Sequence, residues 1–440
     1  MRALLIYPRF PSTFWSYEEV LRLVGRKALL PPLGLVTVAA LLPPEWELRL
    51  VDRNVRDVRE EEWEWAEIVL LSAMIVQAED LVALVGEARR RGKRVVAGGP
   101  FPTSVPSAAL DAGADCVVAG EAETALAPFL EALRSGTARG VFRGEGPRPD
   151  LASSLVPRYD LLDLSAYDSM AVQFSRGCPF DCEFCDITEL YGHRVRPKRP
   201  ERFLAELEAL HALGWRRGVF VVDDNFVGNR RAASKLLAEL ARWQAGHGHP
   251  FHFDTQVTID VAGEAELLDR MVACHFGAVF IGIETPDRAS LEQVGKTPNL
   301  RVSIPAAVET ITAAGLRVMG GFLIGIDGEE AGAGARVVDL MERCAIPTAM
   351  LNLLHALPGT ALWRRLEQEG RLRSGLGELG TRRRCRTSSR RGRWPSSSTS
   401  TARPTTCSTS RGATSIARIA VSSGSARGGR RRRRRGAARG

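Results

Sequence analysis

Short apolar runs alternate with amphipathic stretches through most of the chain, and this alternation predicts its elements. In the first 140 residues the apolar runs predict strands at Ala3–Tyr7, Glu47–Asp52, Glu67–Ser72, Arg94–Gly99 and Cys116–Gly120. Helical periodicity lies between and after them, at Leu33–Leu42, Asp80–Arg91 and Glu123–Arg134. Strands and helices that alternate at this spacing are typical of a doubly wound parallel sheet. Residues 1–140 are therefore predicted to form an α/β, Rossmann-like domain.

The same alternation returns after a stretch rich in Gly, Arg and Pro, which predicts a linker over residues 141–167. Further strands are predicted at Ala171–Ser175, Gly218–Val222, His252–Gln256, Val279–Glu284, Val318–Ile324 and Ala349–Ala356. Helices are predicted at Pro200–Ala212, Arg231–Ala245, Ala265–His275, Ser303–Ala314 and Gly332–Cys344. Residues 168–372 thus form a second predicted α/β domain. In barrels of this kind, catalytic groups lie at the carboxyl ends of the strands.

The charge of the chain is divided unevenly, which changes the meaning of its composition. The net charge is +9, yet residues 381–440 contain 18 Arg and no Lys, Asp or Glu, so the remainder carries 9 − 18 = −9. Residues 373–440 are rich in Arg, Ser and Thr without apolar periodicity, and we expect them to be disordered. Two functional interpretations of this tail are a nucleic-acid-binding arm and a polybasic membrane anchor.

A change of reading frame is a third explanation of the tail. Arg, Ser, Thr, Pro and Gly are the residues that a GC-rich gene yields when it is read out of frame. Back-translation of Arg384–Ser423 allows one shifted frame to encode an acidic, aromatic, protein-like sequence. We therefore hypothesise a frameshift near Gly375–Thr381, which resequencing of the gene would test.

Three cysteines, Cys178, Cys182 and Cys185, form a C-x3-C-x2-C array directly after an apolar run. Thiolates select soft metals such as zinc, copper(I) or iron–sulfur clusters. Three thiolates leave a structural zinc site one ligand short, whereas a [4Fe–4S] cluster held by three cysteines keeps one iron open. With eight cysteines in all, three of them clustered, the chain favours a reducing cytoplasmic location over a disulfide scaffold.

This array closely resembles that of the radical S-adenosylmethionine (SAM) enzymes. The resemblance implies a partial (β/α)6 TIM barrel in which the open iron binds SAM and reduces it to a 5′-deoxyadenosyl radical. It also implies that Phe184 lies near the adenine. Acceptors for SAM's ammonium and hydroxyl groups are predicted at strand ends, where the sequence places Asp223, Asp224, Asn225 and Glu284. A helix cap or surface turn is the alternative role of the Asp-Asp-Asn run.

The first domain resembles the cobalamin-binding domain that precedes the cysteine array in one branch of these enzymes. The matching segments are Pro31–Gly34, Val51–Asp52, Leu71–Met74, Gly98–Pro100 and Gly120–Glu123. The predicted cobalamin-binding residues are Ser72, Ala73, Met74, Gly98, Gly99, Pro100, Gly120 and Glu121. No D-x-H-x-x-G and no histidine precede His193, which predicts a base-off, His-off cobalamin. A Rossmann-like domain without a ligand is the alternative.

Within this branch, several strings resemble those of the hopanoid C-2 methylase group. They are Phe180–Ile187, Glu189–Gly192, Val221–Arg230, Ile283–Pro286 and Ala356–Thr360. The resemblance implies methyl transfer from methylcobalamin to an unactivated carbon of a hydrophobic small molecule or lipid. It also implies an electron donor such as flavodoxin or ferredoxin, and peripheral membrane contact through a lipid substrate.

Other functions remain open on the sequence alone. A cobalamin-dependent radical SAM cyclase or rearranging enzyme would carry the same motifs. A tRNA methylthiotransferase is disfavoured because only Cys116 precedes Cys178. A nucleic-acid-binding protein with a structural iron–sulfur cluster would use the basic tail, but we expect no nucleic-acid partner. The seven histidines show no metal-ligand spacing, His247 and His249 are expected to be solvated, and Tyr191 and His193 are candidates to face the substrate.

Overall fold

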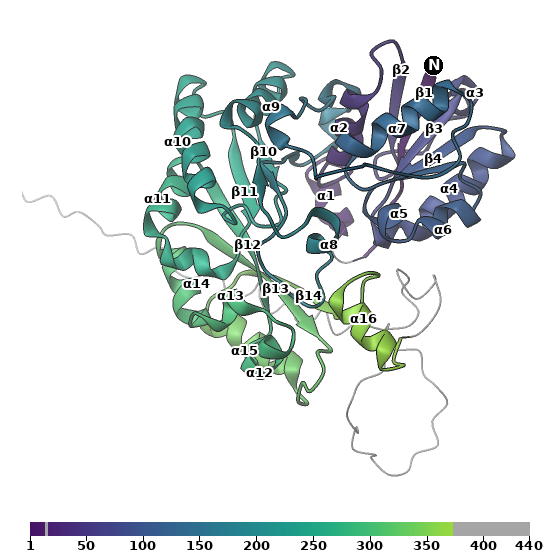
Figure 1. Cartoon of the computed structure of the whole chain (residues 1–440). Coiled ribbons are helices and arrows are strands. Elements are labelled where there is room, and N and C mark those ends of the chain that lie inside the picture. The colour runs from purple at the N-terminus through teal and green to yellow at the C-terminus, as the bar shows by residue number, and fades with distance from the viewer. Residues whose placement is uncertain (14–15, 373–440) are drawn as a thin grey trace, which may run out of the picture.

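Two parallel six-stranded sheets, each flanked by helices, make up the computed structural model, which describes residues 1–13 and 16–372 (Figure 1). The Arg-rich tail and the frameshift hypothesis lie outside the described residues. The predicted α/β fold with two parallel sheets is confirmed.

The first sheet has the strand order β2-β1-β3-β4-β5-β6. Its strands are β1 (Arg2–Tyr7), β2 (Glu47–Asp52), β3 (Ile68–Ser72), β4 (Arg94–Gly98), β5 (Cys116–Ala119) and β6 (Gly140–Arg143). Its helices are α1 (Glu18–Leu23), α2 (Leu33–Leu41), α3 (Glu60–Trp65), α4 (Ala78–Arg90), α5 (Pro100–Ser104), α6 (Pro106–Asp111) and α7 (Ala122–Arg134). Leu4 and Leu5 on β1 are fully buried in different clusters, one on each face, so the apolar run is continuous. The strand order reverses between β1 and β3, where doubly wound sheets bind ligands.

The second sheet has the order β14-β13-β12-β11-β10-β7 and is parallel throughout. Its strands are β7 (Met170–Val172), β10 (Gly218–Val221), β11 (His252–Gln256), β12 (Phe276–Glu284), β13 (Arg317–Ile324) and β14 (Thr348–Leu353). Its main helices are α9 (Pro200–Ala212), α10 (Arg230–Gly246), α11 (Ala265–Ala273), α14 (Ile304–Ala313) and α15 (Ala333–Arg343). The edge strands β7 and β14 do not pair with each other, which makes this an open, partial barrel.

Several short elements complete the barrel domain around the cysteines. They are the antiparallel ribbon β8 (Ser175–Arg176) and β9 (Arg196–Pro197), and the helices α8 (Ile187–Tyr191), α12 (Arg288–Gln293), α13 (Thr297–Leu300) and α16 (Ala361–Gln368). Ser175, expected at the end of a barrel strand, belongs to the ribbon instead, because it pairs with Pro197 while its amide donates to Asp223. The first sheet also extends into the stretch expected to be a linker, since β6 pairs with β5.

Candidate active site

The three cysteines lie on one loop at the carboxyl end of the barrel sheet, between β8 and α8. The Cys178 amide donates to the Gly192 carbonyl oxygen at 3.2 Å, and the Cys185 amide donates to the Cys182 carbonyl oxygen at 3.0 Å. All three side chains are half-buried. Burial raises the pKa of each thiol, to about 12 for Cys185. Cys182 raises the pKa of Cys178 further, and both raise that of Cys185, which places the three thiols within electrostatic reach.

The backbone of this loop depends on a glycine and on a buried acid. Gly177 has φ +95°, and a Cβ there would lie 2.7 Å from the Arg194 carbonyl oxygen, so no larger residue fits. Asp223, fully buried, accepts hydrogen bonds from the Phe174 and Ser175 amides, each at 2.7 Å. The Ser175 hydroxyl donates to the same carboxylate at 2.6 Å. Asp223 thus holds the segment that leads into the cysteines.

Three thiols on one loop fit an iron–sulfur cluster better than a single zinc ion. Zn–S bonds of 2.3 Å in a tetrahedron would bring the sulfur atoms to about 3.8 Å from one another. Among the described residues, the three thiols are not a group whose ligand atoms all lie within 4.8 Å of one another. A cluster spreads its iron atoms and so accepts thiolates that are set further apart, and here it would have one iron without a protein thiolate.

A buried ion pair lies beside the cysteines. Lys296 Nζ is 2.7 Å from Glu284 Oε1, and both side chains are about nine-tenths buried. Burial alone would lower the pKa of Lys296, but Glu284, and then Cys182, hold it above its ordinary value. Glu284 ends β12 with φ +66°, a left-handed backbone that is costly for a residue other than glycine. Phe184 lies under the lysine, whose Nζ is 5.9 Å from the ring centroid.

A second acidic group lies at the barrel mouth and has a different environment. Burial, followed by the charges of Asp223 and Asp186, raises the pKa of Asp224 to about 7. No other residue of the described chain donates a hydrogen bond to its carboxylate. Asn225, in contrast, is committed to Thr258, whose hydroxyl it contacts at 3.2 Å. Asp224 is therefore the member of the Asp-Asp-Asn run that keeps a carboxylate available.

The predicted cobalamin-binding residues gather at the carboxyl edge of the first sheet. They lie where β3, β4 and β5 end: Ser72, Ala73 and Met74; Gly98, Gly99 and Pro100; Gly120 and Glu121. The Ala73 amide donates to the Gly98 carbonyl oxygen at 3.3 Å, which joins the first two loops. A Cβ at Gly99 would lie 2.5 Å from the Ser72 hydroxyl, whereas one at the exposed Gly120 would meet nothing within 4 Å. Glycines leave part of the backbone at this edge without side chains, which fits a flat macrocycle lying against the backbone.

Glu121 connects this edge to the cysteine loop. Its buried carboxylate lies 2.9 Å from Arg176 Nη1 and 2.7 Å from Arg196 Nη2. The two arginines face each other across the β8–β9 ribbon, whose strands precede and follow the cysteine loop. Arg176 also lies 2.8 Å from Glu123. The carboxyl ends of both sheets are therefore fastened together by one charged network.

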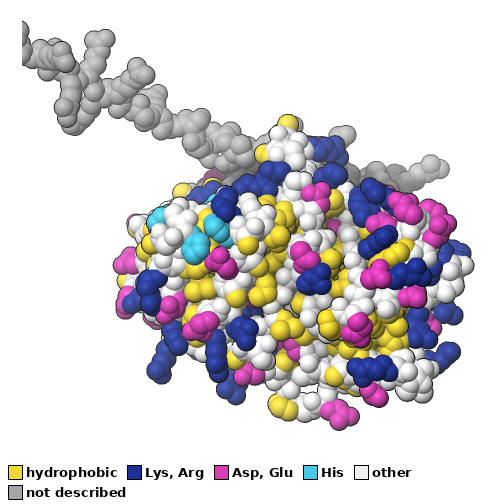
Figure 2. All heavy atoms as spheres, turned by 90° about the horizontal axis from the view of Figure 1, so that it is seen from above, with side chains coloured by type: hydrophobic (Ala, Val, Ile, Leu, Met, Phe, Trp, Pro, Cys, Tyr) yellow, Lys and Arg dark blue, Asp and Glu magenta, His cyan; other side chains and the backbone are white. Residues whose placement is uncertain are grey.

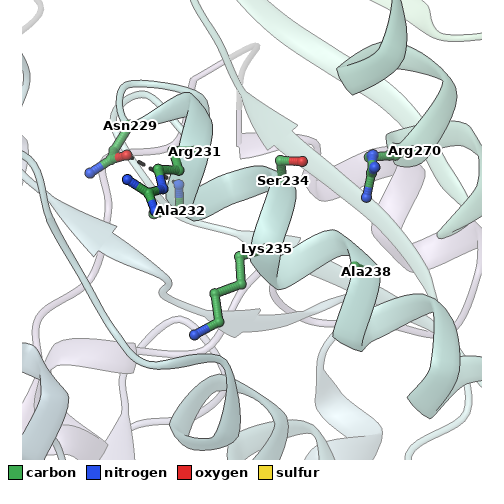
Figure 3. Close-up of a pocket in the computed structure, with 7 residues that line it drawn as sticks. All are labelled: Asn229, Arg231, Ala232, Ser234, Lys235, Ala238 and Arg270. Carbon is green, nitrogen blue, oxygen red and sulfur yellow. Dashed lines mark hydrogen bonds between the residues drawn. The ribbon is translucent and has the colours of Figure 1, made fainter.

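Figure 3 shows the residues around a hollow of about 600 Å³ on the outer surface of the barrel. It lies between α10 and α11 and is lined by Asn229, Arg231, Ala232, Ser234, Lys235, Ala238 and Arg270. None of the predicted site residues contributes to it, and we assign it no part in the chemistry.

Comparison with known proteins agrees with this arrangement. Residues 21–130 match the B12 binding domain, and residues 172–341 match the radical SAM superfamily. An uncharacterised methyltransferase of Synechocystis is 57% identical over 372 residues, which cover 84% of this chain and 69% of that protein. The hopanoid C-2 methylase of Rhodopseudomonas palustris is 36% identical over 376 residues, covering 84% and 71%.

Among solved structures, the radical SAM methyltransferase TsrM from Kitasatospora setae, with tryptophan and a SAM analogue bound, aligns with a TM-score of 0.67. It is 18% identical, and the alignment covers 85% of this chain and 77% of TsrM, which establishes a shared fold. The fold and the cysteine site together define a radical SAM enzyme with a B12-binding domain. The chain belongs to the cobalamin-dependent radical SAM methyltransferase family, which includes the hopanoid C-2 methylase. Its cofactors are SAM, a [4Fe–4S] cluster and cobalamin.

The structure brings together most of the residues predicted from sequence, and it adds others. Cys178 is within electrostatic reach of Asp224 and Lys296, and Cys182 of Glu284. Asp223 and Asn225 are occupied by contacts within the protein. Sequence reasoning missed Lys296, Arg176 and Asp186. A lysine 12 residues after Glu284 was the available signal, since a buried acid at a strand end needs a counter-charge.

Proposed function

We propose that this enzyme methylates an unactivated carbon of a hydrophobic small molecule or lipid. The observation that carries the proposal is the joining of the cysteine loop to the glycine-rich edge of the first sheet by Glu121. When bound, the cofactors would supply reductive cleavage of SAM and a methyl group on cobalt. The protein's task is then to hold both cofactors and the substrate against one shared opening.

Particular residues of this chain suit these tasks. Cys178, Cys182 and Cys185 would ligate the cluster. Lys296 would bind SAM's carboxylate by charge, while Phe184 would offer a flat face to adenine. Glu284 and Asp224 would accept hydrogen bonds from the ammonium and hydroxyl groups of SAM.

The first sheet would hold cobalamin without a histidine ligand. No histidine precedes His193 in the chain, and His193 itself is exposed beside Asp181 at 3.1 Å. The loops of Ser72–Met74, Gly98–Pro100 and Gly120–Glu121 would carry the corrin. We infer a base-off, His-off cobalamin, which the electron paramagnetic resonance spectrum of its Co(II) form would reveal through the absence of nitrogen hyperfine splitting. Nitrogen splitting would contradict this assignment.

The substrate class rests on the relatives and on one exposed surface. The Rhodopseudomonas relative is named as a hopanoid methylase. On α1 and at its C-cap, Val20, Leu23 and Val24 are exposed, Leu23 to 87%, next to the exposed basic Arg22 and Lys27. This surface suits peripheral contact with an anionic membrane that holds a lipid substrate. No helix among the described residues could cross a bilayer. Leu23→Glu should weaken co-sedimentation with phosphatidylglycerol vesicles, and unchanged binding would exclude this surface.

The activity itself is tested by anaerobic reconstitution with iron, sulfide and hydroxocobalamin. We expect 5′-deoxyadenosine to form with dithionite or with reduced flavodoxin or ferredoxin as the electron donor. Hopanoid lipid incubated with SAM carrying a deuterated methyl group should gain that methyl. Cys182→Ala should abolish both, while Cys344→Ala, a half-buried cysteine outside the loop, should retain them. Cluster and SAM cleavage that survive Cys182→Ala would overturn the assignment.

A further inference from the structure

Three metal-ligating side chains meet at a place far from the cysteines. Glu208 and His211 lie on one face of α9, three residues apart, and His247 caps the carboxyl end of α10. Their ligand atoms all lie within 4.8 Å of one another. The sequence predicted no metal-ligand pair among the histidines, whereas His211 and His247 lie close enough to share one ion. Figure 2 shows histidine side chains gathered beside an acidic one on the surface.

The spacing of two of these ligands suits a zinc ion. His247 Nε2 lies 3.1 Å from Glu208 Oε2. Two donors at 2.0–2.1 Å from Zn²⁺ and separated by this distance subtend about 98° at the metal, an angle that four- or five-coordinate zinc accepts. His211 is the third donor, and its ring centroid lies 5.0 Å from that of His247. One of its ring nitrogens lies within 4.8 Å of the other two ligand atoms.

The groups around the cluster orient these ligands. The Nδ1 atom of His247 lies 2.8 Å from the Trp243 carbonyl oxygen. A carbonyl only accepts, so Nδ1 donates this hydrogen bond, and Nε2 is the ring nitrogen that faces Glu208. Trp243 Nε1 donates to Glu208 Oε2 at 3.0 Å, and the indole stacks on His247 at 4.2 Å. Hydrogen bonds of this kind fix the tautomer and the direction of metal ligands.

The surroundings of the cluster carry charge of both signs. Arg216 donates to the His211 carbonyl oxygen at 2.6 Å, and Glu208 supplies the negative charge among the three ligands. Helices α9 and α10 both end here, and their carboxyl ends carry partial negative charge. Glu208 and His247 keep 55% and 28% of their side chains exposed, which leaves a path for the ion.

We propose that Glu208, His211 and His247 bind one Zn²⁺ ion, with water completing the coordination, and that the ion clamps the end of α9 to the end of α10. Two imidazoles and a carboxylate are the donors that zinc accepts alongside water. The site is about 20 Å, the length of α9, from the strand ends that carry the active site. The zinc proposal does not depend on the proposed function.

The test uses the tag-free full chain with its iron–sulfur cluster assembled, so that the three loop cysteines are occupied. Zinc is titrated against a chromophoric chelator. We expect one tightly bound equivalent, with only nitrogen and oxygen ligands in its X-ray absorption spectrum. His247→Asn and Glu208→Gln should each weaken binding at least about tenfold.

His249→Asn is the matched control, because it lies two residues away, outside the ligand set, with φ +55°, which asparagine accommodates. It should bind zinc like the unmodified chain. Thermal unfolding gives a second measurement: zinc should raise the melting temperature of the unmodified chain and of His249→Asn, but not that of His247→Asn. Sulfur ligands, no bound zinc, or equal binding by His247→Asn and His249→Asn would each overturn the proposal.

Discussion

At the residue scale, the lysine beside the cysteines has the most specific environment of the active site. Lys296 is buried against Glu284, lies over Phe184 and is within electrostatic reach of Cys182. A Cβ at Gly282 would lie 2.3 Å from Glu284 Oε1 and 2.9 Å from Lys296 Nζ, so the strand is shaped to admit the pair. Glu284 also has a left-handed backbone, which further fixes the direction of its side chain. Strain of this kind is retained where the surrounding structure aims a side chain at a functional site.

Lys296→Met should therefore destabilise the protein by about 3–5 kcal/mol, because it leaves the buried Glu284 carboxylate without its partner. The urea unfolding midpoint of cluster-free protein measures this. Glu284→Gln combined with Lys296→Met should recover much of the loss. Lys235→Met, at an exposed lysine, is the control. If Lys296→Met were no worse than the control, the pair would be structurally unimportant.

Asp224 should make stability depend on pH. Burial raises its pKa to about 7, above the ordinary value of 3.8, so the folded state binds the proton more tightly than the unfolded state does. Asp224 contributes its full stabilisation below about pH 4. This contribution falls as the pH rises toward 7 and does not change above that. Asp224→Asn should remove this fall.

The measurement is the melting temperature of cluster-free protein between pH 5 and 8. The melting temperature of Asp224→Asn should rise relative to that of the unmodified chain as the pH increases to about 7, and the difference should then stay constant. Asp57→Asn, at an exposed acid paired with Arg9 and Arg53, is the control. Parallel curves for Asp224→Asn and the unmodified chain would contradict the raised pKa.

At the element scale, the cysteine loop is positioned by neighbours rather than by its own secondary structure. The ribbon strand β8 precedes the loop and β9 follows it. The Glu183 amide donates at 2.9 Å to the carbonyl oxygen of Val294, which lies between α12 and α13. The carboxyl end of β7 is held by Asp223. Three separate contacts thus set the conformation of the loop, and small changes in its backbone should alter the positions of the thiols.

Gly177→Ala should lower the iron content after reconstitution to a small fraction of that of the unmodified chain. The new Cβ would meet the Arg194 and Gly192 carbonyl oxygens at 2.7 and 2.8 Å, and φ +95° would be strained as well. Gly146→Ala separates these effects, since it has φ +80° but nothing within 4 Å of its Cβ. Iron per chain and the visible absorbance of the cluster are the measurements. Full iron loading of Gly177→Ala would show that the loop adapts.

The elements also differ in how well the sequence predicted them. The strand β11 and the helix α9 match their predicted limits, because their periodicity is strong and their ends are marked by turns or proline. The short helices α5 and α8 were missed because a single turn has no periodicity. Lys296 and the pair of His211 with His247 were missed for another reason. Their partners are chosen by the packing of separate elements, about which local spacing carries no information.

At the scale of the whole molecule, one carboxylate connects the two halves of the active site. Glu121 was predicted to contact cobalamin, and the structure commits its carboxylate to Arg176 and Arg196, with Arg148 at 3.5 Å. A second contact between the domains is the hydrogen bond from the Tyr167 hydroxyl to Asp52 at 3.1 Å. The relative position of the two cofactor sites depends on these buried polar contacts.

Glu121→Gln should destabilise the domain interface by about 3–5 kcal/mol, because it leaves two buried guanidinium groups undercompensated. We expect faster proteolysis between residues 140 and 170 and a lower melting temperature. Glu131→Gln, which breaks an exposed pair with Arg134, is the control. Cobalamin affinity distinguishes the two roles of Glu121: a loss of affinity with an intact interface would favour direct contact with the corrin.

The docking of α16 has a consequence for how the enzyme is made. The Glu183 carbonyl oxygen accepts from the Leu362 amide at 2.8 Å, and Arg365 binds the Glu183 carboxylate from 182 residues further along the chain. Domains form in order as the chain leaves the ribosome. The first sheet can therefore be complete while the cysteine loop still lacks its last support. Cluster delivery to the finished loop must wait until α16 has left the ribosome, so a shorter nascent chain is a poor acceptor for iron and sulfide.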